Sequence, residues 1–80
     1  MHEQYTLAEI AARDGYLCAL CGLTVDMAIA SPLPDSPSID HIFPISVSRD
    51  DTRSNVQLAH RRCNVAKGAS LPDERPALAA

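Results

Sequence analysis

Two pairs of metal-ligand side chains constrain how this chain can fold more than any other feature. Cys18 and Cys21 are separated by two residues, and so are His60 and Cys63. A Cys-x-x-Cys pair brings two sulfurs to one ion, and residues three apart on a helix lie on one face. The four side chains form a closed tetrahedral set, as structural zinc requires. We therefore expect zinc here, and the alternatives are a redox cysteine pair or buried thiols.

The small size of the chain makes such a site important for folding. With 80 residues, one Phe, two Tyr and no Trp, the chain can bury little apolar surface. Structural zinc contributes about 10–16 kcal/mol of apparent binding energy, more than a core of this size supplies. Three cysteines cannot pair completely into disulfides, and no N-terminal segment resembles a secretory signal. We expect one zinc-stabilised domain in a reducing cytoplasm, without a membrane span.

Charge is distributed unevenly along the chain. Residues 1–40 carry six carboxylates against Arg13, a net charge of -5, whereas residues 41–70 carry five cations against two carboxylates, a net charge of +3. The overall charge of -3 therefore conceals a local basic surface that can bind phosphate. This surface is too modest for an autonomous high-affinity DNA binder.

Local patterns predict two helices and two strands. Thr6 and Glu9 have the spacing of a capping box, which predicts a helix over residues 6–14. Alternation from Ser38 predicts a short strand that Pro44 ends or bends. A second strand is predicted over residues 56–58, and it leads into a helix from about His60 to Lys67 that Gly68 stops.

The remaining segments are predicted to be irregular. Residues 24–38 contain three prolines, and residues 46–54 are polar and charged, so both are expected to be connections. The last ten residues are expected to be a flexible tail. The predicted organisation is an N-terminal helical segment over 1–15, a metal-binding domain over 16–70 and the tail over 71–80.

A second group of polar side chains offers ligands for a different ion. A carboxylate, an imidazole and an amide can supply a metal ligand, a general base and a second metal ligand. Asp40 and His41 are adjacent on a strand, so they leave opposite faces unless the Pro44 turn bends around one site. Asn64 is rotated about 100° around its helix from Cys63, so it points away from the zinc toward another ion. Lys67 lies on nearly the same stripe, where an ammonium could meet a phosphate.

Each of these side chains also has an ordinary structural explanation. His41 alone is typical of an exposed imidazole, and Asp40 of a turn-capping carboxylate. Asn55 fits any turn that needs a local hydrogen bond. Lys67 is equally well explained as a cation near the C-terminus of its helix. Only the combination favours a catalytic site.

Three motifs in the same order resemble the HNH endonuclease family in its His-Asn-Asn variant. They are Asp40-His41-Ile42-x-Pro44, Asn55-Val56-x-Leu58 and Cys63-Asn64-x-x-Lys67-Gly68, preceded by the upstream cysteine pair. The resemblance covers about residues 16–69. It implies an α+β fold of the small ββα-metal type, also called the His-Me finger, in which two antiparallel strands and a helix hold a divalent cation. Here a structural zinc site and an N-terminal helix are added.

The resemblance also implies roles for individual residues. His41 matches the general base that takes a proton from the attacking water. Asp40 and Asn64 match the ligands of the catalytic cation, which is Mg²⁺ or a similar hard ion because the ligands are oxygens. Asn55 matches the central asparagine that holds the loop and orients the imidazole. Two positions depart from the usual pattern, since His60 replaces a zinc-binding cysteine and Asn64 replaces the last family histidine.

These features predict a metal-dependent endonuclease that nicks or cuts DNA with little sequence preference. Arg61, Arg62 and Lys67 are expected to contact the nucleic acid, and few side chains remain to read bases. Small HNH proteins of this appearance are similar to those that accompany bacteriophage DNA packaging. The expected setting is the cytoplasm of a bacterium or infected host, with phage terminase or another targeting protein as a partner. The alternative is a non-catalytic, zinc-stabilised nucleic-acid-binding module.

Overall fold

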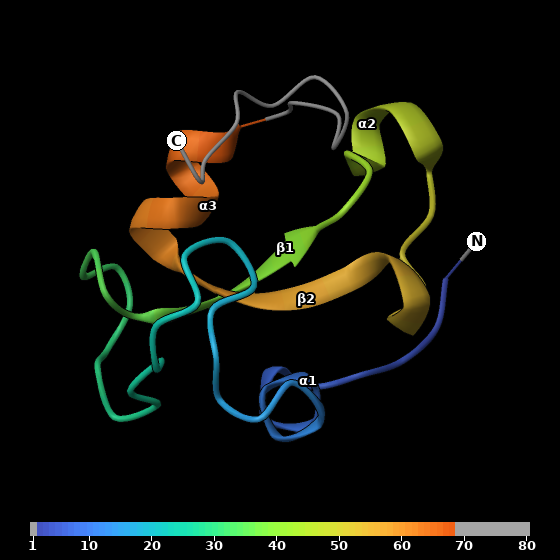
Figure 1. Ribbon diagram of the computed structural model, residues 1–80. Helices are drawn as coiled ribbons and strands as arrows, with labels where there is room; N and C mark the ends of the chain where they lie inside the picture. The colour runs from blue at the N-terminus through green and yellow to red at the C-terminus, as the bar shows by residue number, and fades with distance from the viewer. Residues whose placement is uncertain (1, 69–80) are drawn as a thin grey trace.

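A computed structural model describes residues 2–68 of the chain, and its centre is a two-stranded antiparallel ribbon. Strand β1 (Pro37–His41) pairs with strand β2 (Val56–His60), with Pro37 opposite His60 and His41 opposite Val56. Helices α1 (Leu7–Arg13) and α3 (Arg61–Lys67) lie on opposite sides of this ribbon (Figure 1). The elements follow in the order α1 (Leu7–Arg13), β1 (Pro37–His41), α2 (Ile45–Ser48), the 3₁₀ turn η1 (Arg53–Asn55), β2 (Val56–His60) and α3 (Arg61–Lys67). This is a small α+β fold of the ββα type with an added N-terminal helix.

Helix α1 begins at the capping box that the sequence predicts. The Thr6 hydroxyl accepts a hydrogen bond from the Glu9 amide at 3.1 Å, and the Glu9 carboxylate accepts one from the Thr6 amide at 2.9 Å. These bonds satisfy two of the amide groups that a helix start leaves unpaired. The helix ends at Arg13, and Gly15 follows with a φ of 65°. The predicted helix over residues 6–14 is confirmed.

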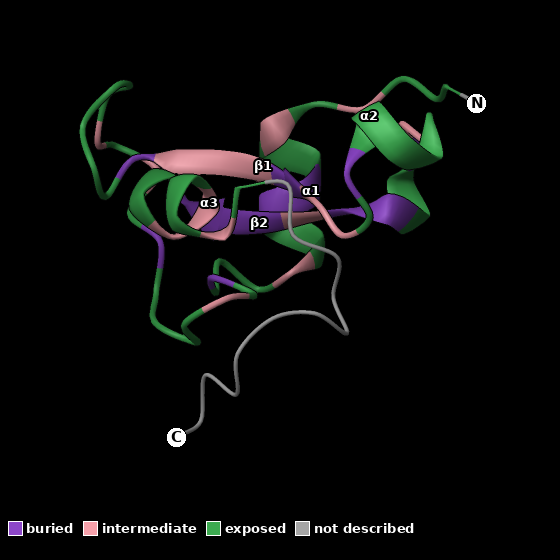
Figure 2. Ribbon diagram, turned by 90° about the horizontal axis from the view of Figure 1, so that it is seen from above, coloured by how far each residue is buried: buried purple, intermediate pink, exposed green. Residues whose placement is uncertain are grey.

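A small core lies between α1, the segment that contains Cys18 and Cys21 (the cysteine segment) and β2. It consists of Ala11, Cys18, Val25, Leu58 and Ala59, all of which are buried. Figure 2 shows that burial follows β2 along most of its length, whereas α2 is exposed. The outer edge of β2 is also paired, because the Leu58 amide donates to the Asp14 carboxylate at 2.8 Å and its carbonyl accepts from Ala19 at 2.9 Å. The strand thereby joins α1 to the cysteine segment.

The predicted strands and the last helix are confirmed, with small shifts at their ends. Strand β1 starts one residue before Ser38 and stops at His41, before Pro44. Strand β2 continues past Leu58 to His60, so His60 is the cap of α3 and not its first residue. The predicted tail over residues 71–80, together with the end of the predicted domain at residue 70, lies outside the described residues.

The prediction that residues 46–54 are irregular is wrong. The single-turn helix α2 and the 3₁₀ turn η1 occupy most of this segment. Pro44 has a φ of -53° that suits entry into a helical turn, and the Ser48 hydroxyl donates to the Pro44 carbonyl at 3.1 Å. Arg49 ends the turn in the left-handed region, with a φ of 54°. Helix α2 has only four residues, all of them exposed, so it is too short for helical periodicity to mark it in the sequence.

Within residues 2–68, none of the helices has both the length and the apolar character needed to cross a bilayer.

Candidate functional site

The four predicted zinc-ligand side chains come together in space. The ligand atoms of Cys18, Cys21, His60 and Cys63 all lie within 4.8 Å of one another. A turn after the first cysteine brings the first two sulfurs together, since the Gly22 amide donates to the Cys18 carbonyl at 2.8 Å. Gly22 has a φ of 82°, a conformation that glycine adopts without a steric penalty. This cluster could hold a metal ion.

The imidazole of His60 is oriented as in a metal-bound histidine. Its Nδ1 lies 3.4 Å from the Cys21 sulfur and 3.9 Å from the Cys63 sulfur. Its Nε2 lies 3.0 Å from the Thr24 carbonyl oxygen. Because a carbonyl can only accept, Nε2 carries the proton and the Nδ1 lone pair faces the thiols. Metal-ligating histidines are commonly fixed in this way by a backbone carbonyl.

The thiols differ in how readily they lose their protons. Burial alone would raise the pKa of Cys18, but hydrogen bonds from the backbone amides of His60, Cys21 and Leu20 outweigh burial and lower that pKa to about 6. Burial raises the pKa of Cys63 to about 12, and the neighbouring charge of Cys18 adds to the effect. A bound cation would relieve this repulsion between thiolates, so the cluster is suited to a metal ion that takes sulfur ligands.

Asp40 is almost fully enclosed between the ribbon and α3. The Lys67 ammonium donates to its two carboxylate oxygens at 2.9 and 3.1 Å, and the Gln57 amide donates to Oδ2 at 2.7 Å. The Asp40 and Lys67 side chains are 2% and 4% exposed. The ammonium also donates to the carbonyls of His41 and Ile42. Lys67 therefore holds the Asp40 carboxylate from inside the protein.

Asn64 faces β1, and not the thiol cluster. Its Nδ2 donates to the Ser38 hydroxyl at 2.8 Å and to the Ile39 carbonyl at 2.9 Å. These bonds commit both amide hydrogens and leave Oδ1 as the acceptor atom. Asp40, His41 and Asn64 all line one pocket of about 270 Å³. The pocket therefore brings together the three residues to which the sequence assigns metal binding and base catalysis.

The side chain of His41 leaves β1 toward a partner that the sequence did not suggest. Its Nε2 lies 2.8 Å from Oδ1 of Asp51, which follows the turn of α2. A hydrogen bond from the Tyr5 hydroxyl, followed by the one from His41, lowers the pKa of Asp51 from 3.8 to about 2. Asp51 is therefore ionised at neutral pH and can only accept, so the neutral His41 ring carries its proton on Nε2 and its lone pair on Nδ1.

Asn55 closes the loop between the two strands. Its Oδ1 accepts from the Phe43 amide at 3.0 Å, and its Nδ2 donates to the carbonyls of Phe43 at 3.0 Å and Asp50 at 2.7 Å. The residue is buried. No hydrogen bond joins its side chain to the His41 ring within residues 2–68, so any influence on the ring passes through the loop backbone.

The three predicted nucleic-acid-binding cations differ in their surroundings. Arg61 is exposed, and the Arg62 side chain is 46% exposed while its Nε lies 2.6 Å from the Asp35 carboxylate. The ammonium of Lys67 is enclosed with Asp40. Arg61 and the exposed part of Arg62 face solvent, where a phosphate can approach them, whereas Lys67 would have to leave the carboxylate that it holds.

A match to a protein-family model shows the family to which the chain belongs. The model of a family described as HNH endonuclease matches residues 21–73, which is more than half of the chain. This chain belongs to the HNH endonuclease family. A comparison with curated proteins finds no match. The HNH family fits the observed ββα arrangement and suggests an activity on nucleic acid.

Sequence reasoning missed three residues around Asp40 and His41. Asp51 and Gln57 hold His41 and Asp40 respectively, and Tyr5 holds Asp51 at 2.6 Å. The contact of Gln57 with Asp40 could have been predicted from the sequence. Pairing two strands that end at His41 and begin at Val56 places Gln57 opposite Asp40. Tyr5 and Asp51 are 46 residues apart in sequence, and no local pattern links them.

Proposed function

We propose that this HNH protein is a metal-dependent endonuclease that hydrolyses phosphodiester bonds in DNA, by nicking or cutting, with little sequence preference. The observation that carries the proposal is the shared pocket of Asp40, His41 and Asn64 within a chain of the HNH family. A carboxylate, an imidazole and an amide around one pocket can supply two oxygen ligands and a proton acceptor.

The donors in this pocket fit a hard cation such as Mg²⁺. Among residues 2–68, Oδ1 of Asp40 accepts only from Lys67, and a carboxylate oxygen has about two acceptor positions, so one position has no donor. Oδ1 of Asn64 is the second oxygen ligand. Mg²⁺ needs only one or two protein oxygens, since it keeps several waters and binds substrate phosphate. When bound, the cation would polarise the scissile phosphate and stabilise negative charge on the leaving 3′ oxygen.

The protein's own groups would handle the proton and the backbone of the substrate. His41 accepts a proton from the attacking water at Nδ1, the nitrogen that the Asp51 contact leaves unprotonated. Asn55 holds the loop that carries Phe43 and Asp50 beside this histidine. Arg61 and Arg62 contact backbone phosphates, which fixes the position of the DNA without reading its sequence.

Zinc is the proposed occupant of the thiol cluster. Three sulfurs and the lone pair of His60 Nδ1 make a complete tetrahedral set, with no position for substrate. The zinc would join the segment around Cys18 and Cys21 to the start of α3, and thereby support the helix that carries Asn64.

The targeting of such an enzyme is a further part of the proposal. The exposed cations on α3 suit backbone phosphates, and contacts to phosphates carry no sequence information. Specificity would then come from a partner protein. The resemblance to small HNH proteins that accompany phage DNA packaging supports a terminase as that partner.

Incubation of supercoiled plasmid with the zinc-loaded protein tests the proposal. The expected result is nicked or linear DNA when Mg²⁺ or Mn²⁺ is added. Neither product should form when a chelator binds all of the added cation, or when His41→Ala replaces the wild-type protein. The matched control is Arg49→Ala, which removes a cation of the same basic segment at a residue that does not line the pocket. Equal nicking by the wild-type protein and His41→Ala would contradict the proposal. Plasmid binding without any cleavage would identify the chain as a zinc-stabilised binding module.

A further inference from the structure

The geometry points to Asp51 as the positioning residue for His41, held in place by Tyr5 and the N-terminal segment. This inference rests on the proposed function, because it concerns the residue proposed as the general base. Asp51 lies outside the three motifs that identify the HNH family in this chain. It lines the hollow of the N-terminal segment with His2 and Tyr5, and not the pocket of Asp40 and Asn64, so it does not belong to the proposed cation ligands.

The Asp51 carboxylate lies at the centre of three side-chain hydrogen bonds. Its Oδ1 accepts from the Tyr5 hydroxyl at 2.6 Å and lies 2.8 Å from His41 Nε2. Its Oδ2 lies 3.0 Å from Nδ1 of His2. Hydrogen bonds to an ionised carboxylate are stronger than those between neutral groups. The three partners therefore fix the orientation of the Asp51 carboxylate, which presents a fixed acceptor to the His41 imidazole.

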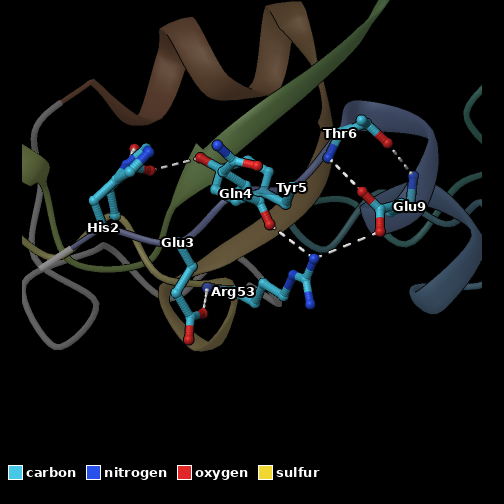
Figure 3. Close-up of a pocket in the computed structure, with 8 residues that line it drawn as sticks. His2, Glu3, Gln4, Tyr5, Thr6, Glu9 and Arg53 are labelled. Carbon is cyan, nitrogen blue, oxygen red and sulfur yellow. Dashed lines mark hydrogen bonds and ion pairs between the residues drawn. The ribbon is translucent and has the colours of Figure 1, made fainter.

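The N-terminal segment, residues 2–5, is itself held beside the loop that carries this carboxylate. The Glu3 amide donates to the Asp51 carbonyl at 3.1 Å, and the Arg53 amide donates to the Glu3 carboxylate at 2.8 Å. The Arg53 guanidinium reaches the Gln4 carbonyl at 2.7 Å and lies 3.6 Å from the Glu9 carboxylate (Figure 3). Backbone and side-chain contacts thus hold the segment beside residues 51–53, and Tyr5 reaches the carboxylate from there.

This arrangement determines which nitrogen of His41 can act as a base. A carboxylate on Nε2 requires the proton there and leaves the lone pair on Nδ1. When water attacks phosphorus, its proton moves to Nδ1, the new P–O bond forms and the bond to the leaving 3′ oxygen breaks. Asp51 keeps its charge throughout and stabilises the imidazolium that results, as the buried carboxylate does in a Ser-His-Asp triad.

A structural role alone would have a different signature. Asp50 is the adjacent carboxylate, and its side chain accepts from the Thr52 amide at 3.1 Å and hydroxyl at 2.6 Å. It stabilises the same loop without touching the imidazole. Asp50→Asn therefore serves as a matched control, because it removes an equal charge from the same loop and keeps an acceptor for Thr52.

The test compares the wild-type protein, Asp51→Asn and Asp50→Asn by nicking kinetics and by ¹⁵N spectroscopy of the histidine rings, with His41→Gln to assign the signals. General base catalysis contributes about 10²–10⁴-fold, so we expect Asp51→Asn to lower kcat by roughly 100-fold or more with KM nearly unchanged. We expect the His41 ring to carry its proton on Nε2 in the wild-type protein and in Asp50→Asn, and to lose this preference in Asp51→Asn.

Two results would overturn the inference. One is a His41 tautomer that is unchanged in Asp51→Asn, and the other is a kcat that falls equally in both aspartate variants. The spectroscopic measurement needs no substrate. If the wild-type protein fails to nick DNA at all, the proposed function fails, while the tautomer of the histidine still decides whether Asp51 positions it.

Discussion

Replacement of Lys67 by methionine should measure how much the buried ion pair with Asp40, beside the proposed cation site, contributes to stability. The substitution keeps most of the length of the side chain and removes only the ammonium, which donates to both oxygens of Asp40 and to two backbone carbonyls. Both side chains of the pair are almost completely enclosed. Removing one partner therefore leaves a buried carboxylate with Gln57 as its remaining donor.

The magnitude follows from that enclosure. Breaking a buried pair by removing one partner typically costs about 3–5 kcal/mol, because the other charge stays buried without compensation. We expect Lys67→Met to lower the free energy of unfolding by roughly this amount. A double variant with Asp40→Asn should be clearly more stable than Lys67→Met alone, because a neutral amide tolerates burial better than an unpaired carboxylate.

Urea denaturation of the zinc-loaded proteins, followed by far-UV circular dichroism, measures these differences. The matched control is Arg61→Met, which removes an exposed cation from the same helix and should change the stability by less than about 0.5 kcal/mol. If Lys67→Met is unfolded before urea is added, the double variant preserves the comparison. A loss below about 1 kcal/mol in Lys67→Met would refute the reasoning, since it would mean that the ammonium is solvated.

Three further predictions concern other parts of the fold. Asn55→Ala removes three buried hydrogen bonds and should cost about 2–4 kcal/mol in a urea titration, so a cost under about 0.5 kcal/mol would contradict its role in the loop. Burial, followed by the hydrogen bond to Asp51, raises the pKa of Tyr5 from 10.0 to about 12. The contribution of the protonated Tyr5 hydroxyl to the free energy of unfolding is therefore complete below pH 10 and is lost as the pH rises through about 12. Phenolate absorbance should therefore show a step near pH 12 that Tyr5→Phe lacks, and loss of a step near pH 10 instead would exclude the shift. His60→Ala should lower the zinc content from about one ion per chain and unfold the domain, whereas unchanged circular dichroism after zinc removal from the wild-type protein would show that zinc is not structural.

Much of this fold could be predicted because the relevant signals are local. The capping box at Thr6 places the start of α1, and alternation around Ile39 identifies β1. The paired spacing of Cys18, Cys21, His60 and Cys63 identified the cluster, because each pair fixes its own geometry within a single turn. Each of these inferences needs only neighbours within a few residues.

What escaped prediction depends on long-range contacts. The position of Lys67 on the same stripe of α3 as Asn64 suggested a cation directed at substrate, but the packing of α3 on the ribbon encloses its ammonium against Asp40. The importance of Asp51 depends on Tyr5 and His2, which reach it from the N-terminal segment. Because such contacts are set by the tertiary fold, no sequence period or motif encodes them.

The central claim is that Asp40 and Asn64 bind one cation beside His41. Anomalous diffraction from crystals of the zinc-loaded protein soaked in Mn²⁺ measures this directly. The account predicts a manganese peak in the pocket, bonded to a carboxylate oxygen of Asp40 and to Oδ1 of Asn64 at about 2.0–2.4 Å, with the thiol cluster occupied separately by zinc. A manganese peak bonded to other residues, or an undisturbed Asp40–Lys67 pair in manganese-soaked crystals without a peak in the pocket, would contradict it.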